Sequence, residues 1–457
     1  MILGDLVARF ETHSPMCVMM RGLLENVFAA ERLNALFERT ARQQFTNQLL
    51  FSTVADMMGL VACRIHPSVH AAYQSKLSEC GVTVKALYDK LRGIERNVSR
   101  EMVRETAAQM AQIIDSTKAT LPPLVKGYQV KIVDGSHLRR TQRRIGELRV
   151  LNSAPLPGHA VVVLDPERKL VVDAIPCEDA YAQERTLLPE LLETIEAKNL
   201  VIADRNFCTA KFLLPIIARQ AGFVIREHGK LRYHFCGKRK KVKQTDSGIV
   251  YEQAIEMEDE AGNTVVIRRV TVELFEKTRN GDSEIHILTN LPPRIRAVRV
   301  AELYRHRWKI EHAFLEVQQN LEGEIETLGY PKAALFSHCM ALVSYNVMSV
   351  LQAALRAAHG TEKIEEEVSV YYVADEIAHT YRGLEIAIPE SYWKKQYASL
   401  SPRQMARALI AIAAQINLGR YRKHKRGPKK KAVPMNKKHR AHVSTSRILA
   451  QRKAPVT

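Results

Sequence analysis

The chain has 457 residues, of which 46% are hydrophobic and 26% charged, a composition typical of a soluble globular protein of about two to four domains. Its net charge of +19 is concentrated near the C-terminus: from residue 391 onward there are 18 Lys or Arg and no Asp or Glu, which leaves 50 basic and 49 acidic residues over 1–390. This localised charge favours a nucleic-acid partner, although an inert solubilising tail remains open.

Two further classes are excluded by the sequence. The longest apolar-rich run, residues 49–65, contains Asp56 and Arg64 and is too short to span a bilayer, and the N-terminus does not have the pattern of a signal peptide, so we expect no membrane partner. The seven cysteines form no C-x-x-C pair, which argues against a zinc module or a disulfide framework. A reducing, cytoplasmic location is expected.

The chain begins with a mainly helical region, residues 1–120, in which apolar residues recur at three- to four-residue spacing, as in 98–116. The segment LPPLVKGY, at 121–128, ends this pattern and opens a region of mixed type. The elements predicted there, over 121–228, are a strand at 128–136, a hairpin at 159–176, a helix at 183–197, a strand at 199–207, a helix at 209–221 and a strand at 222–228. This order predicts a layered sheet of mixed α/β class.

Residues 229–290 are predicted to be a β-rich insertion. Three strand-like segments, 248–257, 264–275 and 283–291, are separated by turn-forming residues, and the basic stretch 229–244 precedes them. A helix over 298–321 follows, and the core region is expected to resume over 291–350. We predict a helical C-terminal region at 351–418 and a basic, disordered tail at 419–457.

Two acidic residues lie where predicted strands become polar. Asp134 ends the apolar stretch of YQVKIVDGS, and Asp204 ends that of NLVIADRNF. Sites in layered α/β proteins form beyond strand ends, because side chains there leave the packed interior. Simpler explanations remain open, since Asp134 precedes a glycine that favours a turn, and Asp204 suits a helix cap or an ion pair with Arg205.

A third acid stands on the helix over 298–321. Its stretch YRHRWKIEHAF places Tyr304, Arg307 and Glu311 on one stripe beside the apolar face. The plain alternative is an i,i+4 ion pair between Arg307 and Glu311, worth about 0.3–0.5 kcal/mol. Asp165, in the hairpin turn, and Asp173 are competing acids. If Asp134, Asp204 and Glu311 converge, their repulsion favours divalent cations, for which oxygen ligands suit Mg²⁺ or Mn²⁺.

The order of these motifs resembles the DDE transposases of bacterial insertion sequences. Asp134 in VDGS, Asp204 in ADRNF and the run Y-R-x-R-W-x-I-E-x-x-F are similar to the insertion sequence four family, whose signature is Y-x2-R-x3-E-x6-K. Gln318 stands at the lysine position of that signature. The resemblance covers about residues 128–350 and implies a ribonuclease-H-like fold, with the β-rich insertion before the catalytic Glu helix and helical regions on either side.

The resemblance also implies an activity. Asp134, Asp204 and Glu311 would hold two Mg²⁺ ions, with Mn²⁺ as a possible substitute, for cleavage at transposon ends and strand transfer into target DNA. The partner would be double-stranded DNA, bound by a homodimer at the bacterial nucleoid, and the helical N-terminal region would bind the transposon ends. The residues assigned to DNA contact are Tyr304, Arg307, Gln318, Trp308, Arg205, Lys238, Arg239, Lys240 and Lys241.

Two other functions remain open. A non-catalytic DNA-binding regulator, or an inactive transposase-derived protein, is slightly favoured by the neutral Gln318, because no Lys or Arg lies between His312 and Pro331 to replace the missing charge. The intact set of three acids disfavours this alternative. A nuclease with the same metal site would hydrolyse DNA without joining strands. An assay for joined products separates the nuclease from a transposase.

Overall fold

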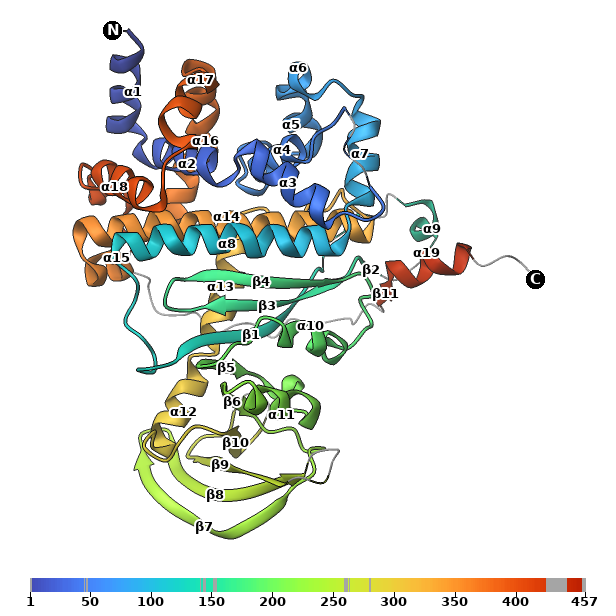
Figure 1. Cartoon of the computed structure of the whole chain (residues 1–457), viewed down its shortest axis with the longest axis vertical. Helices are drawn as coiled ribbons and strands as arrows, with labels where there is room; N and C mark the ends of the chain where they lie inside the picture. The colour runs from blue at the N-terminus through green and yellow to red at the C-terminus, as the bar shows by residue number, and fades with distance from the viewer. Residues whose placement is uncertain are drawn as a thin grey trace.

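The computed structural model describes residues 2–453, except 45, 47, 140, 143, 144, 151–153, 259–261, 263, 279, 280 and 425–441. Its elements form three tiers (Figure 1). A helical tier carries both the N-terminal helices and most of the C-terminal ones, a sheet lies below it, and the strands of that sheet from residues 234–289 close the opposite end. The mixed α/β class predicted from the sequence is confirmed.

Nine of the described strands form one mixed sheet. In spatial order they are β4 (Leu170–Cys177), β3 (His159–Asp165), β1 (Gln129–His137), β5 (Asn199–Ala203), β6 (Gly222–Arg226), β10 (Glu284–Thr289), β9 (Thr264–Leu274), β8 (Gly248–Glu258) and β7 (His234–Thr245). The strands β1, β5 and β6 run parallel to one another, whereas β3 is antiparallel to β1 and β4 to β3. β10 joins β6 in antiparallel pairing. The predicted insertion therefore extends the central sheet.

Successive residues of the central strands enter two different cores, because side chains alternate between the faces of a strand. Ile132 of β1 and Ile202 of β5 pack in the core shared with α12 (Ala297–Arg305) and α13 (Trp308–Asn320). Val133 and Val201 pack in the other core. That second core also holds α10 (Leu188–Leu192) and α11 (Ala210–Ala218). The central strands are thus covered on both faces, as their nearly continuous apolar sequences require.

Two long helices separate the sheet from the rest of the helical tier. Figure 1 shows α8 (Arg96–Thr117) and α14 (Pro331–His359) side by side, and both contact β4. The helix α14 is long and apolar enough to cross a membrane, but its most apolar window is completely buried. Tertiary packing against α8 and β4 therefore accounts for its composition.

The N- and C-terminal helical regions, predicted as separate domains, pack together. The helices before α8 are α1 (Ile2–His13), α2 (Pro15–Val27), α3 (Ala30–Thr40), α4 (Phe51–Ala62), α5 (Val69–Ser75), α6 (Leu77–Cys80) and α7 (Val84–Gly93). Those after α14 are α15 (Thr361–Glu367), α16 (Val370–Ala387), α17 (Glu390–Trp393), the π-helical turn η3 (Lys394–Ala398), α18 (Pro402–Ala413) and the 3-10 turn η4 (Leu418–Tyr421). The helix α2 contacts both α16 and α18, and the same core holds Val7 and Tyr421.

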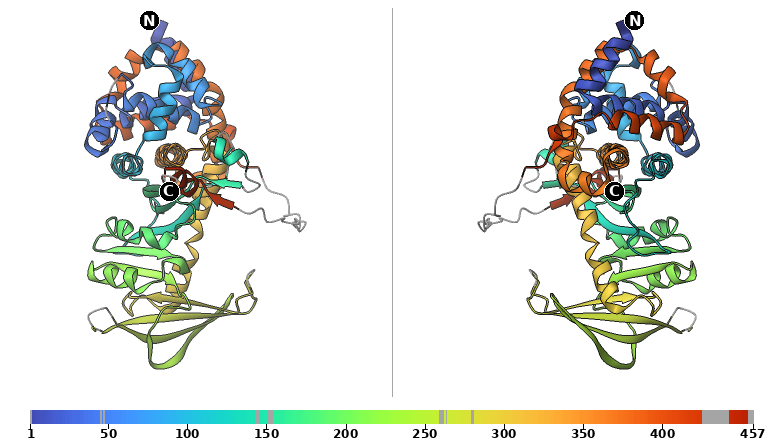
Figure 2. Two further views of the ribbon diagram at one scale, coloured as in Figure 1. Left: turned by 90° about the vertical axis from the view of Figure 1, so that its right-hand side faces the viewer. Right: turned by 90° about the vertical axis from the view of Figure 1, so that its left-hand side faces the viewer.

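Part of the predicted disordered tail is ordered. Strand β11 (His442–Ser444) pairs in parallel with β2 (Ala154–Leu156), and α19 (Thr445–Lys453) contacts the short α9 (Gly146–Arg149) (Figure 2). Arg447 Nε contacts Asp179 Oδ2 at 2.7 Å, and Ser444 Oγ donates to Asp179 Oδ1. One acid thus anchors the segment to the core. The predicted tail over 425–441 lies outside the described residues.

Two predicted helices are interrupted. The helix expected at 298–321 divides between α12 and α13, because Arg307 N–H bonds back to Tyr304 across three residues and Ile310 N–H bonds to Arg307 in the same way. The helix expected at 183–197 becomes a 3-10 turn, η1 (Glu184–Leu187), followed by the short α10, with Pro189 in its first turn. Both breaks lie beside the acidic residues described next.

Candidate active site

The candidate site lies where β1 and β5 stop pairing. Their last parallel pair joins Val133 to Ala203, so Asp134 and Asp204 are the next residues on neighbouring strands. Asp134 and Asp204 lie two residues after Ile132 and Ile202, so their side chains are on the same face of the sheet and point toward the layer of α12 and α13. The two acids predicted from separate motifs are brought together at the C-terminal ends of β1 and β5, hereafter called the strand edge.

The local surroundings bear on the simpler explanations for each acid. Asp134 is not a turn residue, because β1 continues to His137 and Asp134 pairs with Val162 of β3. Asp204 does cap the 3-10 turn η2 (Arg205–Phe207), since its Oδ1 accepts the Asn206 N–H at 2.8 Å. Arg205 is exposed. Capping uses one oxygen of Asp204 and is compatible with a second role for the other.

Helix α13 brings Glu311 to the same place. This helix packs against β1, and Arg307 at its start lies between two of the acids. Its Nη1 contacts Asp134 Oδ2 at 2.8 Å, and its Nη2 contacts Glu311 Oε1 at 2.7 Å. The predicted i,i+4 pair with Glu311 is therefore present, but Arg307 also bridges to Asp134. The long-range contact links the third acid to the strand edge.

The pKa of Asp134 reflects this crowding. The pKa is raised to about 6, chiefly by burial; the charge of Arg307 opposes the rise, and the neighbouring charges of Asp204 and Glu311 contribute to it. The carboxylates therefore lie within electrostatic reach of one another. The site concentrates negative charge, and among the described residues Arg307 is the cation that directly contacts two of its acids.

A fourth carboxylate, Glu184, was missed by the sequence analysis. Its Oε1 lies so close to Gly135 that a Cβ built on that glycine would stand 1.7 Å from it, and the Asn206 amide donates to its Oε2 at 3.4 Å. Burial raises the pKa of Glu184 to about 7, and the charges of Asp204 and Asp134 contribute to the rise. The contact joins an acid in η1 to the glycine that follows Asp134. It could not be predicted from the sequence, because it becomes apparent only when η1 and β1 are known to be neighbours.

The donor set is suited to a hard divalent cation, because all four side chains present carboxylate oxygens. Within the described part of the chain, however, no three acidic, histidine or cysteine side chains meet in a metal-binding geometry. Asp134 Oδ1 accepts the Gly135 N–H at 2.9 Å and its Oδ2 contacts Arg307. The residues fit such an ion chemically, and binding it would require Arg307 to release at least one carboxylate.

The aromatic residues of the predicted signature flank the acids. Tyr304, on α12, is largely buried, and burial raises its pKa while the charge of Arg307 lowers it. Trp308 is 57% exposed, and its ring lies 5.1 Å from the Arg307 guanidinium carbon. Gln318 is exposed farther along α13, where its carbonyl oxygen accepts from Arg64 at 3.2 Å. No described side-chain contact joins Gln318 to the acids.

The basic stretch predicted to contact DNA forms much of β7, the outermost strand of the sheet. Lys238, Lys240 and Lys241 are exposed there. Arg239 differs from them, because it contacts Glu284 at 2.9 Å and lies 3.9 Å from the ring of Tyr251. Its charge therefore has a partner within the sheet, and the DNA contact expected of it stays a prediction.

The competing acids have structural partners. Asp173 is completely buried and contacts Arg100 at 2.9 Å. Asp165 contacts Arg168 and accepts the Glu167 and Arg168 N–H groups in the hairpin turn. Both acids therefore stabilise the packing of the hairpin, and neither supplies a carboxylate to the edge of β1 and β5.

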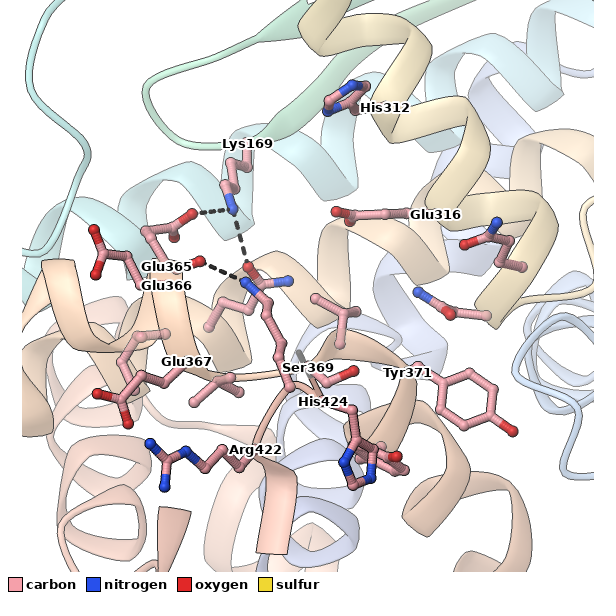
Figure 3. Close-up of a pocket in the computed structure, with 18 residues that line it drawn as sticks. Lys169, His312, Glu316, Glu365, Glu366, Glu367, Ser369, Tyr371, Arg422 and His424 are labelled. Atoms are coloured by element: carbon pink, nitrogen blue, oxygen red, sulfur yellow. Dashed lines mark hydrogen bonds and ion pairs between the residues drawn. The ribbon is translucent and has the colours of Figure 1, made fainter. Parts of the chain in front are cut away.

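A cavity of about 980 Å³ lies on the other flank of α13, lined in part by His312 and Glu316 (Figure 3). Lys169, from the turn between β3 and β4, reaches Glu365 at 2.6 Å across it, and Arg356 contacts the same carboxylate. Because these charged groups are paired with one another, the cavity is a weaker candidate than the strand edge despite its size.

Part of the chain is similar to a known protein family. Residues 125–342, which include Asp134, Asp204 and Glu311, match the family model described as a transposase DDE domain. Among solved structures, the chain is similar to piggyBac transposase in a synaptic complex with hairpin DNA, at 9% identity and a TM-score of 0.39 over 84% of each chain. No curated protein matches the chain.

Proposed function

We propose that the chain is a DNA transposase of the insertion sequence four type, which cleaves transposon ends and joins them to target DNA with divalent cations. The observation that carries this proposal is the convergence of Asp134, Asp204 and Glu311, from two strands and a helix, inside a segment that matches a transposase DDE domain. Three carboxylates at a strand edge are the ligand type that two-metal phosphodiester chemistry needs.

The strand order supports a ribonuclease-H-like core. The antiparallel series β4, β3 and β1 is followed by the parallel strands β5 and β6, and helices cover both faces. On this proposal the core comprises residues 121–228 and 291–350, and β7 to β10 extend it. Residues 1–120 would contribute to binding transposon ends, alongside the helices after α14 with which they pack.

The proposed chemistry assigns a task to each side chain. Asp134, Asp204 and Glu311 would hold the cations, which would supply activation of an attacking oxygen and neutralisation of the leaving one. Arg307, released from a carboxylate, would bind phosphate through its planar fork, with Tyr304 beside it. Trp308 has an exposed face on which a base could stack. Gln318 would donate a hydrogen bond to phosphate in place of the lysine charge.

The assembly would act on DNA. The exposed lysines of β7 and the basic residues after 391 offer phosphate contacts that do not depend on sequence. Because both ends of a mobile element must be held together, we propose a homodimer formed on DNA in the bacterial cytoplasm. Arg205, exposed beside Asp204, is a further candidate for phosphate contact.

The test uses single substitutions that preserve shape. Asp134→Asn, Asp204→Asn and Glu311→Gln should each lower Mg²⁺-dependent cleavage of DNA bearing the gene's flanking sequences by at least about 100-fold. DNA binding should stay within about threefold of wild type, because binding relies on basic residues elsewhere. The matched control is Glu302→Gln on α12, an acid 50% exposed and paired with Arg299, which should cleave normally. Near wild-type cleavage by any of the three site variants would refute the assignment.

A non-catalytic DNA-binding protein is the second candidate, and one observation favours it. Arg307 already pairs with both Asp134 and Glu311, so part of their negative charge is compensated without a metal. This alternative predicts salt-dependent DNA binding that is indifferent to Mg²⁺, with no cleaved strands. A nuclease would instead cleave without forming joined products, which the same reaction mixtures reveal on a gel.

A further inference from the structure

Glu184 reaches the acidic site from the layer opposite Glu311. Glu311 stands on α13, whereas η1 and α10 lie across the sheet, in the core that holds Val133 and Ala203. The side-chain position at residue 135 points toward that second layer, because it alternates with Asp134 along β1. Glu184 Oε1 fills the space that a side chain at 135 would occupy. Gly135 is thus an opening through which a carboxylate approaches the strand edge.

The contacts of Glu184 hold it in place without balancing its charge. Its Oε2 accepts from the Asn206 amide, and Arg185 Nε donates to the Asn206 carbonyl at 2.8 Å. The Asn206 N–H in turn bonds to Asp204. Within the described part of the chain, no Lys or Arg forms an ion pair with Glu184, although it is only partly exposed and has two acids as neighbours. Such an arrangement costs free energy unless a cation compensates it.

We propose that Glu184 is a fourth carboxylate of this site, which binds the divalent cation together with Asp134 and Asp204, and that Gly135 is required to admit it. The inference rests on the proposed function, because it concerns the same cation. The cation would then be held from both sides of the sheet, by Glu311 on one side and Glu184 on the other. Removing the Glu184 charge should therefore weaken cation binding even when the three predicted acids are intact.

The experiment measures Mn²⁺ binding to the full chain without DNA, by calorimetry and by the electron paramagnetic resonance signal of free Mn²⁺. Glu184→Gln, which keeps the shape, should weaken Mn²⁺ binding by about tenfold or more. Glu196→Gln is the matched control, since it makes the same change at an exposed acid beyond α10. Asp204→Asn tests whether one of the three predicted acids is needed for Mn²⁺ binding. Without Mn²⁺, the melting temperature of Glu184→Gln should equal or exceed that of wild type, because the substitution removes an uncompensated charge.

A second variant tests whether Glu184 needs the space left by Gly135. Gly135→Ala leaves every carboxylate in the chain but should push Glu184 away, because the added Cβ would meet its Oε1 at 1.7 Å. The far end of a glutamate is flexible, so the fold should survive, and Mn²⁺ affinity should fall as in Glu184→Gln. In the double variant Gly135→Ala with Glu184→Gln, the two losses should not add, because both remove the same ligand.

The outcomes separate this inference from the proposed function. If Asp204→Asn abolishes Mn²⁺ binding while Glu184→Gln binds like wild type, the role of Glu184 is overturned and the three-acid site stands. If wild type itself binds no Mn²⁺ up to millimolar concentrations, or if Asp204→Asn binds normally, the cation site fails and both proposals fall. Selective weakening in Glu184→Gln and Gly135→Ala, with Glu196→Gln unchanged, supports the fourth carboxylate.

Discussion

Arg307 is the residue on which the electrostatics of the site depend. It is 13% exposed and bonds to both Asp134 and Glu311. Replacing it with glutamine should lower the free energy of unfolding at neutral pH and without metal by roughly 1–3 kcal/mol, because two partly buried carboxylates lose their cation. Mn²⁺ should raise the melting temperature of Arg307→Gln more than that of wild type, since the ion takes over the lost countercharge.

Thermal unfolding with and without Mn²⁺ checks this prediction. Arg39→Gln is a suitable control, because it breaks an ion pair with Glu105 in which the Arg39 side chain is 58% exposed, and exposed pairs contribute little. Equal melting temperatures for Arg307→Gln and wild type without metal would contradict the bridging role.

His159 gives the protein a predictable sensitivity to acid. Its ring is completely buried and stacks on His137 at 5.1 Å, and burial followed by the His137 charge lowers the pKa of His159 to about 4, although Asp179 opposes the shift. Between pH 6.5 and 4 the unfolded chain binds the extra proton, so stability falls as the pH falls through this window. The loss should reach about 3 kcal/mol near pH 4.

Phenylalanine at this position tests the prediction, because it keeps an aromatic ring and cannot titrate. In His159→Phe, denaturant unfolding measured from pH 7 to 4 should lose the part of the pH dependence that His159 contributes. His379→Gln, which alters a histidine whose side chain is 76% exposed, should follow the wild-type profile. A wild-type profile for His159→Phe would show that the acid sensitivity comes from other groups.

At the same scale, the sequence predicted three site acids and missed the fourth. Asp134, Asp204 and Glu311 each end or follow a recognisable apolar pattern, and their order along the chain is characteristic. Glu184 lies in a segment that reads as an amphipathic helix, and its significance comes from Gly135, nearly fifty positions away. Periodicity reports which face a residue occupies, and it carries no information about which distant residue lies opposite.

At the scale of elements, strands were more predictable than helix continuity. Central strands such as β3 and β5 are buried along their whole length, and a short apolar run bounded by polar residues identifies them. The break between α12 and α13 could not be predicted, since no Pro or Gly lies near residues 306 and 307. Contacts of Arg307 with Asp134 and Glu311 accompany the break, and these are tertiary interactions.

Strand β7 yields a prediction about DNA. Changing Lys238, Lys240, Lys241 and Lys243 to glutamine should weaken binding to all sequences alike and reduce the slope of log affinity against log salt by up to about 3.6, at about 0.9 for each phosphate that is no longer neutralised. Fluorescence anisotropy between 50 and 200 mM salt measures this slope. Arg239→Gln should change it little, because Glu284 already pairs with that guanidinium. An unchanged slope in the lysine variant would exclude β7 from the interface.

At the scale of the whole molecule, helices from residues 2–93 and 361–413 meet in one helical tier. Sequence patterns gave both regions the correct helical character, but they could not predict that α2 would pack against α16 and α18. The ordering of 442–453 was equally hidden, because it depends on contacts with Asp179 and β2. Long-range docking of this kind leaves no local signal in composition.

The positive charge of the C-terminal segment is expected to promote association with DNA. Eight Lys or Arg lie within residues 425–441, and replacing them with glutamine should lower DNA affinity and slow association most strongly at low salt. Stopped-flow association at two salt concentrations provides the measurement. Equal association rates at low salt would identify this charge as a solubilising feature only.

The continuous nine-stranded sheet has a mechanical consequence. Through β8, β9, β10, β6 and β5, hydrogen bonds connect β7 to β1 without a hinge. At about 4.8 Å per strand, β7 lies roughly 29 Å from β1 along that path. If β7 binds DNA as proposed, a force on the bound duplex would be transmitted through these hydrogen-bonded strands to the strand ends that carry Asp134 and Asp204.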